Sequence, residues 1–172
     1  MKLKNNTSLV LSPERESKKS YTEQEAFNKL SALCAATEYC EADMRRKMLR
    51  WELPEGAENR IIAKLYKERF IDDRRYAHAF VRDKFRYNHW GRVRISRELK
   101  MRNIASNIID EALNEIPEED NLETLQRLID NKRKSVKGKS EYEVRTKLIR
   151  FALGRGFCLE DIIKVVGNVD VE

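Results

Sequence analysis

One pattern of apolar residues occurs twice in this chain, at a constant separation of 53 positions. In the first copy, Ile95, Leu99 and Ile104 are spaced as on one face of a helix and the turn that follows it. The second copy has the same spacing in Leu148, Ala152 and Phe157. A weaker third copy, with Met44 and Met48 at the helical positions, precedes both. Units of this size cannot bury a substantial core alone, so the pattern predicts that neighbouring units pack in tandem.

The composition favours helices throughout this arrangement. Only 3 prolines and 6 glycines interrupt 172 residues, and 37% of the residues are charged. We therefore predict an all-α protein of three tandem three-helix repeats, in which the second and third helices of each repeat resemble a helix-turn-helix. The high charged fraction indicates an elongated array with a large surface. We expect a disordered basic tail at residues 1–20 and repeats at residues 21–71, 72–117 and 118–172.

Local signals predict where several helices begin and end. Asp72 or Asp73 is expected to cap the first helix of the second repeat. Asn103 tolerates the left-handed conformation and is expected to end the next helix. A helix over about residues 41–51 is expected to carry Trp51 on its inner face. Reciprocal capping pairs are expected at Thr22–Glu25, Asp120–Glu123 and Ser140–Glu143.

Positive charge is concentrated in the second repeat. Residues 72–104 contain ten lysines and arginines against four acidic residues, whereas residues 105–127 contain one basic residue against seven acidic ones. A basic surface of this kind suits nucleic acid or an acidic protein. Pairing between the two segments, or a solvated surface, would explain the same clusters. The candidate contacts are Arg82, Lys84, Arg86, Arg92, Arg94, Arg97, Lys100 and Arg102.

Two finer expectations concern this basic segment. Arg94 and Arg97 are three positions apart, so they are expected to share an outward face of one helix. Trp90 lies in a predicted loop, where it could pack within its own repeat or contact a partner. Should the candidate residues not bind the partner, the basic connection at residues 132–139 is the alternative site.

The chain lacks the residue sets that catalysis or metal binding requires. Three cysteines without paired spacing and two histidines do not form a zinc pattern, and the cysteines are expected to be reduced and buried. Gly138 to Ser140 resembles the end of a phosphate-binding loop but lacks the upstream glycine and strand. Asp72 and Asp73 are better explained as helix caps than as metal ligands. We therefore predict a binding protein without catalytic activity, metal or cofactor.

No targeting or membrane segment is expected either. The apolar run at residues 9–11 is too short for a signal peptide, and no run approaches the length of a membrane span. These features predict a cytoplasmic protein.

The second repeat resembles the RecX family, whose members regulate the RecA recombinase. The residues that carry this resemblance are Phe70-Ile-Asp-Asp73, Arg75-Tyr-Ala77, Gly91-Arg-Val-Arg-Ile95, Glu98-Leu99, Arg102-Asn-Ile104 and Ile108-Ile109. Part of the pattern recurs in the third repeat, at Lys147-Leu148 and Arg155-Gly-Phe157. Coverage extends over about residues 21–166. The sequence departs from the family at Asn103, where glycine is usual, and in a long turn near Pro54.

The resemblance implies a curved array of helical repeats that lies in the groove of the RecA–DNA filament. It implies that the protein inhibits ATP hydrolysis and strand exchange by RecA, and so regulates DNA repair, recombination and the SOS response. It further implies a monomer with weak, salt-dependent affinity for single- and double-stranded DNA, and neither a cofactor nor catalysis by this chain.

Two other functions remain open from the sequence. A transcriptional regulator could use a helix-turn-helix to bind one duplex site, usually as a dimer. A helical adaptor without a nucleic-acid role would show no salt-dependent retention on DNA.

Overall fold

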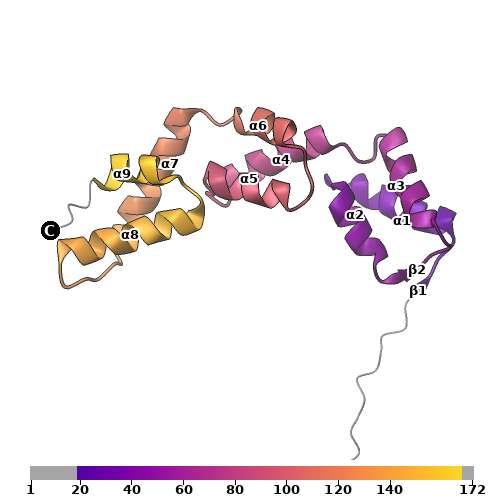
Figure 1. Cartoon of the computed structure of the whole chain (residues 1–172), viewed down its shortest axis with the longest axis horizontal. Coiled ribbons are helices and arrows are strands. Elements are labelled where there is room, and N and C mark those ends of the chain that lie inside the picture. The colour runs from indigo at the N-terminus through magenta and orange to yellow at the C-terminus, as the bar shows by residue number, and fades with distance from the viewer. Residues whose placement is uncertain (1–18, 168–172) are drawn as a thin grey trace, which may run out of the picture.

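The protein is a row of three helical units that follow one another along a shallow arch (Figure 1). The computed structural model describes residues 19–167, which form nine α-helices and two short strands. Each successive group of three helices encloses its own cluster of buried apolar side chains. This arrangement confirms the predicted all-α class with three tandem three-helix repeats in an elongated, curved array.

The first unit contains three helices and both strands. Its elements are β1 (Lys19–Ser20), α1 (Glu23–Cys34), α2 (Glu41–Met48), β2 (Trp51–Glu52) and α3 (Ala57–Lys67). The predicted capping box is present, because the Glu25 N–H donates to Thr22 Oγ1 at 3.3 Å and the Thr22 N–H donates to Glu25 Oε2 at 2.9 Å. Leu30, Met44 and Leu65 are completely buried where the three helices meet.

Two expectations for the first unit are wrong. The helix predicted to extend to Trp51 ends at Met48, and the predicted tail is not without structure up to Ser20. Lys19 and Ser20 instead pair in parallel with Trp51 and Glu52, and the Trp51 ring packs on Tyr21 with centroids 4.9 Å apart. A local helical pattern cannot reveal this pairing, because its two strands are far apart in the sequence. Residues 1–18 of the predicted tail lie outside the described residues.

The second unit follows the sequence signals closely. It consists of α4 (Asp73–Arg86), α5 (Arg92–Lys100) and α6 (Ser106–Leu113). Asp72 caps α4 by accepting a hydrogen bond of 2.9 Å from the Arg75 N–H. Asn103 has φ 60°, so it ends α5 in the expected left-handed conformation. The unit buries Ile95, Leu99 and Ile109 completely in its core.

The first helix of the third unit begins three residues earlier than its capping signal predicted. Its helices are α7 (Glu118–Arg133), α8 (Glu141–Arg155) and α9 (Leu159–Val166). Pro117 occupies the position before α7, so the expected cap at Asp120 is wrong. Acidic residues in the first turn of α7 favour this earlier start through the helix dipole. Ser140 does cap α8, but the Glu143 carboxylate accepts from the Lys139 N–H rather than from Ser140.

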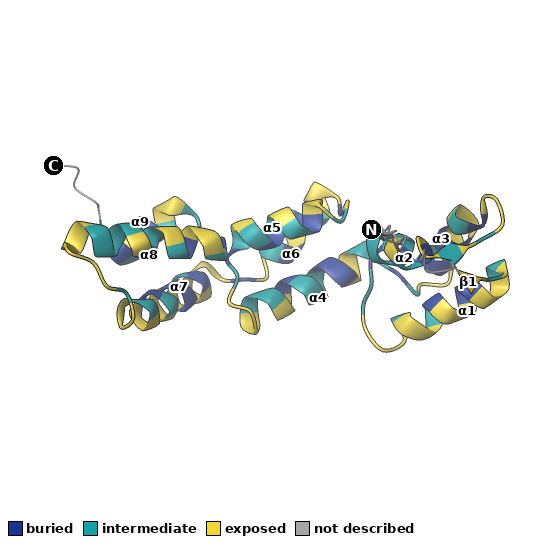
Figure 2. Ribbon diagram, turned by 90° about the horizontal axis from the view of Figure 1, so that it is seen from below, coloured by how far each residue is buried: buried dark blue, intermediate teal, exposed yellow. Residues whose placement is uncertain are grey.

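The three units place corresponding helices along the same edges of the row. The first helices α1, α4 and α7 lie along one long edge, and the second and third helices lie along the opposite edge (Figure 2). The second helices α2, α5 and α8 also lie along the inner side of the arch (Figure 1). A partner lying inside the arch would therefore meet one second helix from each unit.

Main-chain hydrogen bonds join the second and third units. The Gly91 N–H donates to the Arg155 carbonyl at 2.9 Å, and the Val93 N–H donates to the Gly156 carbonyl at 3.0 Å. The first N–H groups of α5 thus bind the last carbonyl groups of α8, so each helix end satisfies the other. This contact brings Gly91 against Gly156, where a Cβ on Gly91 would lie 2.2 Å from the Gly156 oxygen.

Side chains, by contrast, join the first and second units. The Tyr66 hydroxyl donates to Asp73 Oδ1 at 3.0 Å. Arg75 Nε donates to Glu38 Oε1 at 2.6 Å, and its guanidinium also binds the carbonyls of residues 69 and 70. Cys40 lies in the apolar core of the second unit, beside Tyr76. The two junctions therefore differ in chemistry.

Candidate partner-binding face

The eight basic residues predicted as contacts all lie on α4, on α5 or directly after α5. Both helices turn their apolar residues inward, burying Tyr76, Ala77 and Val81 on α4 and Ile95 and Leu99 on α5. The basic residues occupy the remaining positions of each helix. Some of these basic side chains contact other parts of the protein, and the others are free.

Four of the eight side chains are held within the structure. The Arg94 guanidinium stacks on the Trp90 ring at 3.9 Å and donates to the Gly154 carbonyl. Arg92 donates to the Ile116 carbonyl. Arg102 pairs with Glu98 at 3.0 Å, and Lys84 lies 5.4 Å from the centre of the Trp90 ring. These residues position the helices and the junction with the third unit. Trp90 thus packs within the protein, one of the two alternatives for this residue.

The other four side chains are exposed. Over residues 19–167, none of them makes a hydrogen bond or an ion pair. These four free cations are Arg82 and Arg86 on α4, and Arg97 and Lys100 on α5. Arg94 and Arg97, which were expected to share an outward face, differ in their contacts, because Arg94 is held by Trp90 while Arg97 remains available to a partner. Free cations can be neutralised by a phosphate or carboxylate without first breaking an internal contact.

The acidic segment neutralises part of the basic charge within the second unit. Arg74 on α4 pairs with Glu111 on α6, and His78 Nδ1 lies 2.8 Å from Glu115 Oε1. Arg82 and Arg86 border a small hollow that also contains Glu115 and Asp120. Internal pairing, the alternative explanation of the charge clusters, therefore accounts for one side of α4. The cations on α5 are separate from these carboxylates.

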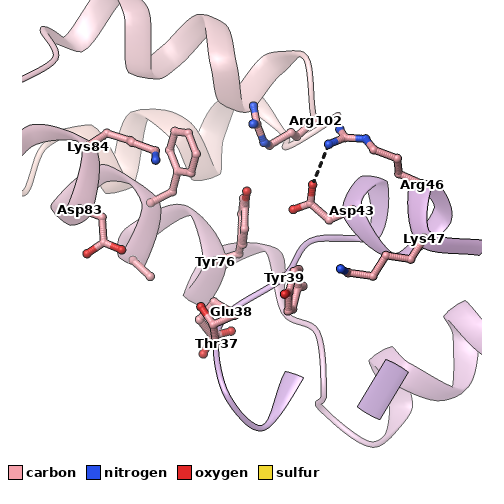
Figure 3. Close-up of a pocket in the computed structure, with 12 residues that line it drawn as sticks. Thr37, Glu38, Tyr39, Asp43, Arg46, Lys47, Tyr76, Asp83, Lys84 and Arg102 are labelled. Carbon is pink, nitrogen blue, oxygen red and sulfur yellow. Dashed lines mark ion pairs between the residues drawn. The ribbon is translucent and has the colours of Figure 1, made fainter. Parts of the chain in front are cut away.

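A cavity of about 470 Å³ lies between the first and second units (Figure 3). Tyr39 and Tyr76 come from opposite sides of it, and Asp43 forms an ion pair of 3.6 Å with Arg46 at its border. Its other charged residues are Glu38, Lys47, Asp83, Lys84 and Arg102. Groups of both signs line the cavity, so its charge does not favour one class of ligand. Among residues 19–167, no main-chain hydrogen bond of the kind found between the second and third units spans the junction that contains the cavity.

Sequence reasoning missed this cavity and the internal role of four predicted contacts. The cavity combines α2 and the connection between α1 and α2 with residues of α4 and with Arg102. These segments are far apart in the chain and share no motif. The stacking of Arg94 on Trp90 had a weak signal, since the two residues are four positions apart. Their separation alone could not show that the Gly154 carbonyl would complete the contact.

The cysteines differ in accessibility, so the expectation that all three are buried is wrong. Cys40 is fully buried, whereas Cys34 and Cys158 are partly exposed, and all three are free thiols. Burial raises the pKa of the Cys40 thiol to about 11. The Cys40 thiol also donates to Asp43 Oδ2 at 3.2 Å, which further fixes it in place.

We predict that Cys40 reacts with iodoacetamide far more slowly than the other two cysteines. The thiolate is the reactive form, and both burial and the raised pKa suppress it. Timed alkylation of the native protein at pH 7.5, followed by peptide mass spectrometry, measures the three rates separately. Denatured protein is the control, in which all three should react at similar rates. Equal rates in the native protein would contradict the burial of Cys40.

The described residues contain no group arranged for metal binding or phosphate-loop chemistry. Over residues 19–167, no three His, Cys, Asp or Glu side chains gather as metal ligands. The segment from Gly138 to Ser140 leads into the cap of α8, where the Ser140 hydroxyl accepts from the Glu143 N–H at 3.2 Å. Within the same residues, no helix has the length and apolar character needed to cross a membrane.

Two sequence models of one family match this chain over the units just described. The model of the second three-helix domain of RecX matches residues 72–113, and the model of the third three-helix domain matches residues 118–166. Together they cover more than half of the 172 residues. The chain belongs to the RecX family. The resemblance at the Gly91 and Arg155 motifs is thereby confirmed.

Individual RecX proteins are similar over most of this chain. The regulatory protein RecX of Bacillus thuringiensis (strain Al Hakam) is 28% identical over 140 residues, covering 78% of this chain and 52% of that protein. The regulatory protein RecX of Bacillus cereus (strain B4264) is 28% identical over 145 residues, covering 80% and 52%. The chain thus spans about half the length of these curated relatives.

Solved structures show the same fold. A crystal structure of a regulatory protein RecX matches with a TM-score of 0.75 at 22% identity, covering 84% of this chain and 70% of that one. RecX from Lactobacillus salivarius matches with a TM-score of 0.70 at 21% identity, covering 86% and 96%. At these identities the likeness concerns the arrangement of the helices.

Proposed function

We propose that this protein binds the filament that RecA forms on DNA and lowers its ATP hydrolysis and strand exchange. Membership of the RecX family carries the proposal, because the similar proteins are named as regulatory proteins. The protein would act as a cytoplasmic monomer in the control of DNA repair, recombination and the SOS response. It would need no cofactor, and it would show weak, salt-dependent affinity for single- and double-stranded DNA.

The four free cations support this proposal physically. Arg82, Arg86, Arg97 and Lys100 are exposed on α4 and α5 and have no partner among the described residues. A nucleoprotein filament presents phosphates and carboxylates. Both attract these cations over distances up to about the Debye length. Binding of this kind is fast at low salt and weakens as salt rises.

An ATPase assay tests the proposed function. RecA is first assembled on single-stranded DNA, and ATP hydrolysis is then followed as the protein is added up to a stoichiometric excess. The rate should fall as the protein is added. An unrelated DNA-dependent ATPase on the same DNA should be unaffected. An unchanged RecA rate at excess would refute the function, and selective protection of one duplex site would favour the transcriptional regulator instead.

Removing the four free cations should weaken filament inhibition. With Arg82, Arg86, Arg97 and Lys100 all changed to glutamine, we expect roughly tenfold more protein to be needed for half-inhibition at low salt. The variant should also show a flatter dependence on salt, because fewer charges are neutralised on binding. Circular dichroism should remain that of the wild type, since all four residues are exposed.

A matched variant controls for total charge. Lys29, Lys67, Lys134 and Lys137 are exposed elsewhere on the protein, and their change to glutamine removes the same charge. Inhibition by this control should stay close to that of the wild type. A larger loss in the control than in the α4–α5 variant would move the site toward the α7–α8 connection.

A further inference from the structure

The repeat relationship aligns one exposed arginine from each unit. Met44 corresponds to Ile95, and Ile95 corresponds to Leu148, as the first buried residue of each second helix. Two positions after these residues stand Arg46 on α2, Arg97 on α5 and Arg150 on α8. All three arginines are exposed. A step of two residues turns a helix by about 200°, so each arginine points away from the core of its own unit.

Each of these arginines has an exposed apolar neighbour on the same helix face. Leu49 follows Arg46 by three positions and is 70% exposed, and Leu153 follows Arg150 by three positions and is 47% exposed. In the second unit Met101, 62% exposed, follows Arg97 by four positions. Residues three and four positions apart are neighbours on a helix surface. Each second helix therefore presents an arginine beside an uncovered apolar side chain.

The arginines are available for binding. Neither Arg97 nor Arg150 forms a side-chain hydrogen bond or ion pair within residues 19–167. Arg46 makes a single ion pair of 3.6 Å with Asp43, with 67% of its own side chain exposed. A long ion pair of an exposed arginine contributes little, so Arg46 can exchange Asp43 for another carboxylate. A partner can thus bind all three arginines without disturbing the fold.

We propose that Arg46, Arg97 and Arg150, with their apolar neighbours, form a repeated strip that binds a protein surface carrying regularly spaced carboxylates. The inference rests on the proposed function, in which the partner is a filament of identical protein subunits. The second helices, which carry the three arginines, lie along the inner side of the arch (Figure 1), so a partner held inside the arch would meet all three helices. A regular array of contacts matches a regular filament.

The apolar neighbours favour protein over DNA as the partner of this strip. Arginine and methionine are enriched at protein interfaces, where apolar side chains are buried beside charged pairs. The phosphate backbone of DNA offers no surface that would bury Leu49, Met101 or Leu153. Leu49 and Leu153 occupy the same position of their repeats, and Met101 lies one position later in the second unit. An exposed apolar side chain therefore follows the arginine in every unit, which a protein partner explains.

Charge reversal of the strip tests the inference. Arg46→Glu, Arg97→Glu and Arg150→Glu are made singly and together, and binding to RecA assembled on labelled single-stranded DNA is compared with binding to the same DNA alone. We expect each single change to weaken filament binding about five- to tenfold, and the triple change to weaken it about 100-fold or more. Affinity for DNA alone should change by less than about threefold. A charge-matched control combines Lys29→Glu, Lys67→Glu and Lys134→Glu, which lie outside the second helices.

The outcomes separate the strip from the proposed function. If the wild type neither binds nor inhibits the filament, the proposed function and the strip are both refuted. If the wild type is active and the triple variant is equally active, only the strip is refuted. Equal losses of DNA and filament binding would make DNA the partner and would also overturn the inference. Leu49→Ser with Leu153→Ser leaves charge unchanged and should weaken filament binding alone, so the inference is tested even if the triple variant folds poorly.

Discussion

Replacing Gly156 by alanine should lower the free energy of unfolding by about 3 kcal/mol or more. A Cβ at this position would lie 2.2 Å from Arg94 Cβ and 2.6 Å from the Arg94 nitrogen, so the second and third units would have to move apart. Gly156 also has φ 90°, a conformation that an L side chain rarely adopts. Both effects act at one residue, which explains the size of the expected loss.

Gly154→Ala provides a control only two residues away. Over the described residues, nothing lies within 4 Å of a Cβ added to Gly154, which is inside α8 and exposed. This change should stabilise the protein by up to about 1 kcal/mol, because alanine favours a helix over glycine. Urea denaturation of both variants measures the two effects. Similar stability of Gly156→Ala and the wild type would show that the close contact between Gly156 and Arg94 is wrong.

Gly156→Ala should alter the junction between the second and third units as well as the stability of the protein. The main-chain bonds from Gly91 to the Arg155 carbonyl and from Val93 to the Gly156 carbonyl depend on the close approach of the two units. Hydrogen exchange of the Gly91 and Val93 amides should therefore accelerate in Gly156→Ala. The amides in the middle of α1 should exchange as in the wild type, because that helix belongs to the first unit.

Replacing Leu99 by alanine should cost about 3 kcal/mol of stability. Leu99 is completely buried in the core of the second unit, together with Ile95 and Ile109. Loss of its side chain removes buried apolar surface and leaves a space that the surrounding helices fill only in part. The exposed Leu49 provides the control, since Leu49→Ala should change stability by less than about 0.5 kcal/mol.

Because Leu99 lies in the middle unit, Leu99→Ala should also destabilise the neighbouring units. In a row of repeats, each unit is stabilised by contacts with its neighbours. Destabilising the second unit should therefore accelerate hydrogen exchange in all three units. Leu30→Ala, which affects the core of the first unit alone, should act mainly on α1, α2 and α3. Equal patterns of exchange in the two variants would contradict an array of separate cores.

The two junctions between units differ in how firmly they fix the relative positions of the units. Main-chain bonds and a glycine contact hold the second and third units together. Side-chain contacts join the first and second units, with a cavity of about 470 Å³ between them. Side-chain contacts tolerate small shifts better than a direct contact between backbones does, because side chains can change rotamer. The relative position of the second and third units is therefore the better defined of the two.

Local sequence patterns were sufficient for the features that depend on neighbouring residues. The cap at Asp72, the left-handed Asn103 and the capping box at Thr22 each require only a short segment of chain. Where a distant segment competes, the local pattern failed. Trp51 lies outside α2, contrary to the prediction, because its backbone pairs with Lys19.

The candidate binding residues show the same limit. A count of charges identified the second unit, but it could not separate free cations from those held in place. Arg94 and Arg97 look equivalent in the sequence, yet Trp90 and the Gly154 carbonyl hold only Arg94. The alignment of Arg46 with Arg97 and Arg150 is visible in the repeat, whereas their exposure required the structure.

The sequence by itself determined the helical class, the repeated unit and the family resemblance. These properties follow from the spacing of apolar residues and from glycines and caps, which act over a few positions of the chain. Tertiary structure alone decided how the units join and which basic residues remain free. Both depend on tertiary contacts, such as Gly91 with Gly156 and Arg94 with the Gly154 carbonyl, and no local propensity encodes such contacts.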